Sequence, residues 1–101
     1  MLGVLVTFQY GDDFDRERLV TIASEARDKF QGMPGLRDKY FTVDDAKQRA
    51  VNFYAWEWED QGLSFFSEAM IEQITAIYGV RPTIELLEIV ELVDNSENSI
   101  E

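Results

Sequence analysis

The sequence predicts a single α+β domain in which strands and helices follow the order β-α-β-β-α-β. Four stretches rich in branched and aromatic residues are typical of strands, and two stretches between them repeat apolar residues at helical spacing. Glycine, proline or aspartate marks the junctions. With 101 residues the chain is long enough for one hydrophobic core and too short for a second.

The stretch from residue 51 to residue 58 organises the rest of the prediction. Read as a strand, it points Asn52, Tyr54, Trp56 and Trp58 to one side and Val51, Phe53, Ala55 and Glu57 to the other. Both sides are largely apolar, so we expect this strand to lie inside a sheet that is covered on both faces. In a chain this short, one of the two covers is expected to come from another subunit.

The first two elements precede this stretch. Residues 2–10 are rich in branched and aromatic residues and are expected to form the first strand. Its two sides are Val4, Val6, Phe8 and Tyr10 against Leu5, Thr7 and Gln9. A helix should follow and end near Gln31, before Gly32, because apolar residues recur in it every three or four positions. Three acidic residues stand at its start as candidate caps: Asp12, Asp13 and Asp15.

The second and third strands are expected to form a hairpin. Residues 36–43 alternate, and Arg37, Asp38 and Lys39 suit a strand at an exposed edge of the sheet. The polar connector 44–48 is short enough to return residues 49–58 antiparallel to them. We therefore expect an edge strand beside the central one.

A second helix and a fourth strand complete the order. Asp60 is the candidate cap of the helix, Gly79 is its expected end, and its apolar stripe consists of Leu63, Phe66, Met70, Ile74 and Ile77. Residues 83–93 are expected to form a long strand that is apolar on both faces. Residues 1–94 thus form the predicted domain, and 95–101 a polar C-terminal tail.

This order of elements is that of the ferredoxin-like fold, in which two helices cover one face of a four-stranded antiparallel sheet. The second face carries branched and aromatic residues in strands one, three and four, which would leave a large apolar surface in water. We therefore predict a homodimer in which two sheets close face to face as a dimeric α+β barrel.

Composition narrows the classes of function. The formal charge is −11 at pH 7, so nucleic acids and anionic membranes would repel the protein on average. No apolar run approaches the ~18 residues of a membrane span and the first residues lack a basic signal-peptide start, so we expect a cytoplasmic protein. The chain has neither cysteine nor histidine, which removes the usual ligands of zinc and haem iron and the base of histidine triads. We expect no metal and no cofactor.

Two sets of residues resemble a known superfamily. Val51 and Asn52, followed after three residues by Trp56 and Glu57 and after one more by Glu59, resemble the third-strand pattern of antibiotic-biosynthesis-type monooxygenases. These are small dimeric α+β barrels. A second likeness, to the YdhR-type monooxygenases of the same superfamily, covers nearly the whole chain. It is carried by Phe8, Tyr10, Gly11 and Phe14, by Met33, Pro34, Gly35, Leu36, Lys39 and Thr42, and by Tyr78, Gly79 and Val80.

The resemblance implies oxygenation of a small reduced aromatic or polyaromatic substrate, such as a quinol or anthrone, without metal or flavin. Such a substrate, once deprotonated, can pass an electron to dioxygen itself, so the protein need only hold it, favour its anion and exclude water. The family's pocket Asn and Trp correspond to Asn52 and Trp56, which would lie on one face about 13 Å apart along the strand. Both are the candidate catalytic residues.

Three further residues are candidate substrate contacts. Tyr54 lies between the candidate catalytic pair, and Phe66 or Ser67 stands where histidine-bearing branches of the family place a ligand or base. Arg81 is the only basic residue after Arg49, and its guanidinium suits an anionic substrate or an oxyanion. The chain has Gly62 where one branch has a tyrosine, and no general base is evident.

Structural interpretations of the same residues remain open. Trp56 suits a packed core as well as a pocket, Asn52 suits a hydrogen-bonded buried spacer, and Arg81 suits an ion pair with one of the 20 acidic residues. The acidic run at residues 57–60 is better explained as a strand end and helix cap than as a metal site. The alternatives to an oxygenase are a non-catalytic small-molecule binding dimer, a purely structural dimer, and a lactone or dienol isomerase.

Overall fold

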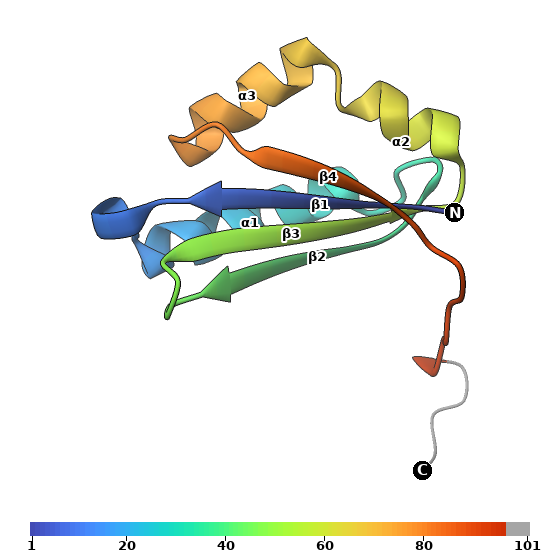
Figure 1. Ribbon diagram of the computed structural model, residues 1–101, viewed down its shortest axis with the longest axis horizontal. Helices are drawn as coiled ribbons and strands as arrows, with labels where there is room; N and C mark the ends of the chain where they lie inside the picture. The colour runs from blue at the N-terminus through green and yellow to red at the C-terminus, as the bar shows by residue number, and fades with distance from the viewer. Residues whose placement is uncertain (97–101) are drawn as a thin grey trace.

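A computed structural model describes residues 1–96 of the chain. Within these residues, four strands form one antiparallel sheet in the order β2-β3-β1-β4, and the helices lie against the sheet (Figure 1). The elements are β1 (Leu2–Gln9), the 3₁₀ turn η1 (Gly11–Asp13), α1 (Arg16–Phe30), β2 (Leu36–Asp44), β3 (Arg49–Trp56), α2 (Glu59–Phe65), α3 (Glu68–Tyr78) and β4 (Thr83–Glu88). The predicted ferredoxin-like order is confirmed, with the second helix divided in two.

The core lies between the sheet and the helices. Alternate residues of the two central strands point into it, and Val4, Val6 and Phe8 of β1 have no exposed surface. The register pairs Val4 with Tyr54 and Val6 with Asn52, so this side of β3 also faces the helices. Burial of these branched and aromatic side chains supplies the main stabilisation of the fold.

The start of α1 and the position of β2 agree with the sequence. Asp15 caps α1 by accepting a hydrogen bond from the backbone N–H of Arg18 at 3.2 Å. The strand β2 lies at an edge of the sheet as predicted, and a bulge at Arg37 shifts its register. The expected edge role of Lys39 is wrong, because after the bulge Lys39 pairs with Tyr54 and so shares the helix-facing side of the sheet.

The second helix was predicted as one continuous element, and this prediction is wrong. Phe66 leaves helical geometry at φ −92° and ψ 51°, and Ser67 then caps α3 through its hydroxyl and the backbone N–H of Met70 at 3.2 Å. Asp60 lies in the first turn of α2, and the capping residue is Trp58. Because the chain turns at Phe66, the apolar stripe is split between two helices.

Both predicted long strands end early. The central strand β3 ends at Trp56, although the next backbone N–H, that of Glu57, still donates to the carbonyl of Gly35 at 2.8 Å. The strand β4 stops at Glu88, which pairs with Leu2, the first residue of β1. One further bond joins the N–H of Ile89 to the carbonyl of Met1. The predicted strand to residue 93 is therefore wrong.

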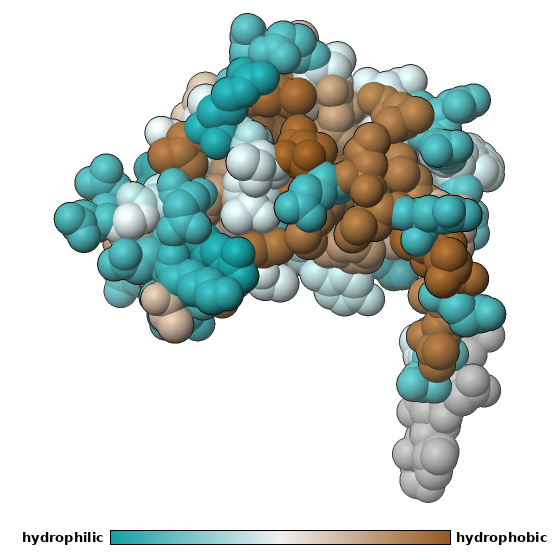
Figure 2. All heavy atoms as spheres, viewed as in Figure 1, coloured by the Kyte–Doolittle hydropathy of each residue, from teal (hydrophilic) through white to brown (hydrophobic). Residues whose placement is uncertain are grey.

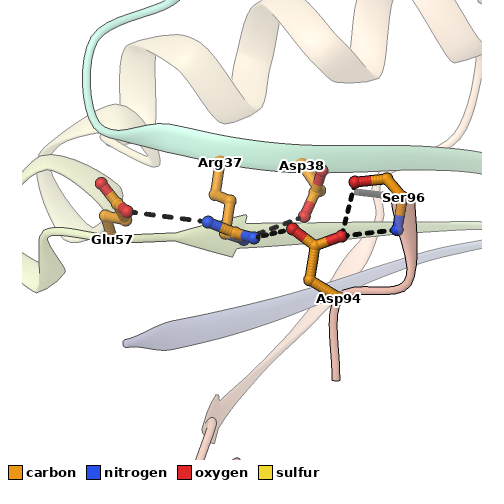
Figure 3. A network of polar contacts seen from close by, with 5 residues as sticks. All are labelled: Arg37, Asp38, Glu57, Asp94 and Ser96. Carbon is orange, nitrogen blue, oxygen red and sulfur yellow. Dashed lines mark hydrogen bonds and ion pairs between the residues drawn. The ribbon is translucent and has the colours of Figure 1, made fainter. Parts of the chain in front are cut away.

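The segment after β4 is anchored at Arg37 (Figure 3). The guanidinium of Arg37 contacts the carboxylate of Asp94 at 2.7 Å and also reaches Asp38 and Glu57 at 3.5 and 3.9 Å. The Ser96 hydroxyl donates to the same Asp94 carboxylate at 2.6 Å. The bulge in β2 thus binds the last residue of the predicted domain, Asp94, just before the predicted polar tail. Residues 97–101 of that tail lie outside the described part of the chain.

The second face of the sheet has no helix over it within residues 1–96. By register it carries Leu5, Val51, Phe53, Ala55 and Leu87. Gly3 leaves room on this face, because an added Cβ there would lie 3.0 Å from the ring of Phe53. Figure 2 shows apolar surface near β4 that continues along the segment after it, where Val90 and Val93 are 82% and 77% exposed. In the part of the chain described, no helix is long and apolar enough to cross a bilayer.

Candidate functional site

A cavity of about 230 Å³ lies between the sheet and the helices. Its wall is mainly apolar and includes Met33 from the loop after α1 and Met70 from α3. Six polar or titratable side chains also line it: Lys29, Lys39, Asn52, Tyr54, Gln73 and Tyr78. An apolar cavity with a few convergent polar groups is the usual form of a small-molecule site.

The side chains of Asn52 and Tyr78 are joined at one wall of the cavity. Asn52 is 3% exposed, and its amide donates to the Tyr78 hydroxyl at 3.1 Å. Tyr78 stacks on Phe8 with ring centroids 3.7 Å apart, and its backbone carbonyl accepts from the Tyr10 hydroxyl at 2.8 Å. Because the Tyr78 oxygen accepts from Asn52, its own hydrogen can point to a ligand.

Burial controls the protonation of the tyrosines. Desolvation raises the pKa of Tyr54 and of Tyr78, although the hydrogen bond from Asn52 partly opposes the shift at Tyr78. Burial also raises the pKa of Tyr10 to about 12. These phenols are therefore neutral hydrogen-bond donors at neutral pH and cannot act as bases.

Trp56 packs into the core and does not line the cavity. It is 1% exposed, lies parallel to Tyr54 with centroids 6.2 Å apart, and contacts Phe65 at 5.5 Å. Gly62 approaches it so closely that an added Cβ would stand 2.7 Å from the indole ring. The indole N–H is buried without a hydrogen-bond partner in residues 1–96. The structure thus separates Trp56 from Asn52, which does line the cavity.

Phe66 and Arg81 also lie outside the cavity lining. Phe66 contacts the edge of Tyr54 with centroids 4.9 Å apart. Arg81 is exposed and forms a two-bonded ion pair with Glu68, at 3.0 and 3.2 Å. Their predicted contacts with substrate stay predictions, because nothing in the structure tests them.

Lys39 is one of the polar residues of the cavity that were not predicted from the sequence. Its ammonium lies 3.4 Å from the ring centre of Phe30, 4.2 Å from that of Phe41 and 4.3 Å from that of Tyr54. Burial lowers the pKa of Lys39 to about 7, and the charge of Lys29 adds to the shift. The amine is therefore partly uncharged near neutral pH.

The register of the hairpin formed by β2 and β3 predicts which way Lys39 faces. Phe41 pairs with Asn52 and Lys39 with Tyr54, so counting back from the connector at residues 44–48 places Lys39 on the face of Asn52. Tyr78 could have been found from the helical stripe, since it follows Ile74 by four residues. The argument for Lys39 depends on the register of the two strands, which charge patterning alone does not set. The argument for Tyr78 depends on helical spacing.

A groove of about 630 Å³ lies outside the cavity, between α1 and the edge strand β2. Arg27 and Arg37 line it, and it shares Phe30, Lys39 and Phe41 with the cavity. These three side chains therefore form the partition between the groove and the cavity. Among residues 1–96, no group of three or more acidic side chains is placed to hold a metal ion.

Comparison with known proteins places the fold. No protein-family model matches the sequence, and no curated protein matches it. Among solved structures, the cofactor-independent oxygenase SnoaB from Streptomyces nogalater superposes with a TM-score of 0.65 at 12% identity, over 91% of this chain and 95% of that one. The ActVA-Orf6 monooxygenase of Streptomyces coelicolor, in complex with nanaomycin D, superposes with a TM-score of 0.65 at 17% identity, over 94% and 92%.

A third neighbour is similar. A Bordetella bronchiseptica protein, described as an antibiotic biosynthesis monooxygenase, superposes with a TM-score of 0.67 at 16% identity, over 89% of this chain and 97% of that one. At these identities the likeness concerns the fold. The resemblance seen in the sequence is therefore confirmed at that level, and the chain has the fold of the antibiotic biosynthesis monooxygenases.

Proposed function

We propose that the protein is a cofactor-independent monooxygenase acting on a small reduced aromatic substrate, quinol-like or anthrone-like. The observation that carries this proposal is the apolar cavity with Asn52, Tyr78 and Lys39 on its wall. Two neighbours with the same fold, SnoaB and ActVA-Orf6, are described as oxygenases, which supports the proposal.

The cavity suits the chemistry of a phenolate reacting with dioxygen. Such an anion reduces dioxygen without a cofactor, provided that its ring is held and water is excluded. The Asn52 amide and the Tyr78 hydroxyl are donors that can face a phenolate oxygen, and the apolar remainder of the wall excludes water. The volume of about 230 Å³ is below the ~300–1,000 Å³ of ordinary ligand pockets, which favours the one-ring and two-ring quinols of this class over the three-ring anthrones.

We assign roles to the predicted site residues accordingly. Asn52 orients the substrate oxygen directly or through Tyr78, and Tyr54 forms part of the ring-binding wall. Trp56 and Phe66 act by packing against Tyr54. Arg81 stays a predicted contact for an anionic substituent.

Oxygen uptake by the chelator-treated protein tests the proposal. The substrates are naphthohydroquinones, anthrones and catechols, and the variants are Asn52→Ala and Trp56→Phe, with the exposed Trp58→Phe as the matched control. We expect uptake above the spontaneous rate that falls at least tenfold in Asn52→Ala and is unchanged in Trp58→Phe. Binding of the same compounds without uptake would instead favour the non-catalytic binding dimer.

We also propose that residues 1–94 act as one domain of a cytoplasmic homodimer, with the second face of the sheet as the interface. The apolar residues on that face, together with the exposed Val90 and Val93, support this arrangement. Leu87→Lys should give a monomer by light scattering at micromolar concentration. Leu63→Lys on α2 is the control, because Leu63 and Leu87 are 46% and 45% exposed. A monomeric wild type would contradict the proposal.

A further inference from the structure

Lys39 occupies an unusual place for a lysine. Its ammonium lies within 4.3 Å of three ring centres, which belong to Phe30, Phe41 and Tyr54. The same side chain lines both the inner cavity and the outer groove. A ligand that enters the cavity from the groove therefore passes the Lys39 amine.

The groups that surround Lys39 do not neutralise it. Those that face the cavity or the groove are Arg27 and Lys29 of α1, Arg37 and Asp38 of β2, Tyr54 of β3 and Tyr78 of α3, while α2 contributes the apolar Phe65. The Asp38 carboxylate contacts Arg37 at 3.5 Å. Within residues 1–96, no carboxylate lies in ion-pairing range of Lys39.

This environment acts on the two protonation states of Lys39 in opposite ways. Burial and the nearby Lys29 lower the pKa of Lys39 to about 7, so a free amine is available at neutral pH. The faces of the three rings attract the ammonium once it forms. A bound phenolate would supply the counter-charge that the cavity lacks. It would raise the proton affinity of Lys39 above that in the empty site, which lets the amine hold a proton taken from the phenol.

We propose that Lys39 is the proton acceptor for a phenolic ligand bound in the cavity. The O–H bond of the phenol breaks, an N–H bond forms at Nζ of Lys39, and the ligand is held as a phenolate beside the new ammonium. No electron is transferred in this step. The proposal rests on the proposed function for its class of substrate. It assigns the role of general base to Lys39, a role for which the sequence alone indicated no residue.

Absorbance and calorimetry with 2-naphthol test the proposal at pH 8, where this two-ring phenol is protonated in solution. The naphtholate absorbs at longer wavelength than the naphthol, so the spectrum reports the ionisation of the bound ligand. Titration in two buffers of different ionisation heat reports the protons exchanged with solvent. We expect the wild type to bind naphtholate with no net release of protons, because Lys39 keeps the proton.

Three variants separate a proton acceptor from a mere positive charge. Lys39→Met should bind neutral naphthol, with at least about tenfold less anion, the factor that one pKa unit represents. Lys39→Arg should bind naphtholate but release one proton to the buffer, because a guanidinium is already charged. Lys47→Met removes an exposed lysine of the β2–β3 connector and should match the wild type.

The outcomes distinguish this proposal from the oxygenase. The role of Lys39 would be overturned if the wild type bound neutral naphthol. It would also be overturned if the wild type bound naphtholate with release of a proton. Oxygen uptake that is undiminished in Lys39→Met would also overturn it and leave the oxygenase standing. Lys39-dependent naphtholate with no oxygen uptake from any quinol would support Lys39 and remove the oxygenase. A wild type that does not bind 2-naphthol would overturn the role of Lys39, with oxygen uptake still deciding the oxygenase separately.

Discussion

Two ends of one face of β3 differ although they are only four residues apart. At one end Trp56 is 1% exposed and is enclosed by Tyr54, Phe65 and Gly62. At the other end Asn52 is equally buried but lies at the wall of a cavity of about 230 Å³. One end is a filled core, and the other is a site that can hold a ligand.

The difference arises from the side chains that cover each end. The first turns of α2 approach the sheet at Gly62, which lets the indole ring fill the space below them. Around Asn52 the cavity wall includes the side chains of Tyr78 and Lys39, whose polar tips need partners or space. A shared strand face therefore does not make a shared site.

Trp56→Ala should have the largest effect on the packed end. Removal of a fully buried large aromatic from a filled core costs about 3–5 kcal/mol in the free energy of unfolding. Urea unfolding measures this loss. The control is Trp58→Ala, since Trp58 is 58% exposed and its removal should cost less than about 0.5 kcal/mol. Equal losses for the two variants would mean that Trp56 is not packed as described.

Lys39→Met should change how stability depends on pH. In the unfolded chain the lysine keeps its proton up to the ordinary pKa of 10.5, whereas in the folded chain the pKa is about 7. Between these values the unfolded state binds more protons, so wild-type stability rises with pH, by at most about 1.4 kcal/mol per unit. Below pH 7 the cost of charging Lys39 is fully present.

The measurement for Lys39 is urea unfolding at several pH values from 6.5 to 9.5. The difference between wild type and Lys39→Met should grow in favour of the wild type as pH rises through this window. Lys47→Met, at an exposed site, should follow the wild type. A pH-independent difference would show that the folded state does not depress the pKa of Lys39.

Tyr78→Phe tests the polar wall of the cavity. The Asn52 amide would lose its acceptor inside the protein, which costs about 1–3 kcal/mol in the free energy of unfolding. Asn52→Leu combined with Tyr78→Phe should cost less than the sum of the single changes, because one hydrogen bond connects them. Strictly additive losses would mean that the two groups do not interact.

Arg81→Ala is expected to have the smallest effect. Arg81 and Glu68 are both exposed, and their ion pair lies outside the cavity lining. We expect a change of less than about twofold in the affinity for 2-naphthol, measured by calorimetry. A larger loss would support the sequence-based prediction that Arg81 contacts the substrate.

Much of the fold could be predicted from the sequence because its signals are local. The alternation in β1 and the cap at Asp15 depend on neighbouring residues, and the structure has both. The end of β4 is set instead by where β1 begins, because Glu88 pairs with Leu2 and the sequence of β4 remains strand-like beyond it. The break at Phe66 was missed because helical spacing continues through it.

The site was less predictable than the fold. Asn52 was singled out because a polar amide among aromatic residues on a buried strand needs a partner, and the structure supplies Tyr78. Lys39 was assigned to the surface because lysine usually is exposed, and only the register of the hairpin turns it inward. Whether a buried face is filled or hollow depends on long-range packing, which no local pattern contains.

The position of a bound ligand tests the central claim most directly, and the three methionines of the chain report on it. Met33 and Met70 line the cavity, whereas Met1 lies at a separate depression near β4. With ¹³C-labelled methionine methyl groups, titration with 2-naphthol should shift the NMR signals of Met33 and Met70 and leave that of Met1 unchanged. A shift of Met1 alone, or no shift of Met33 and Met70 at saturating ligand, would contradict a ligand site at the Asn52 end of the sheet.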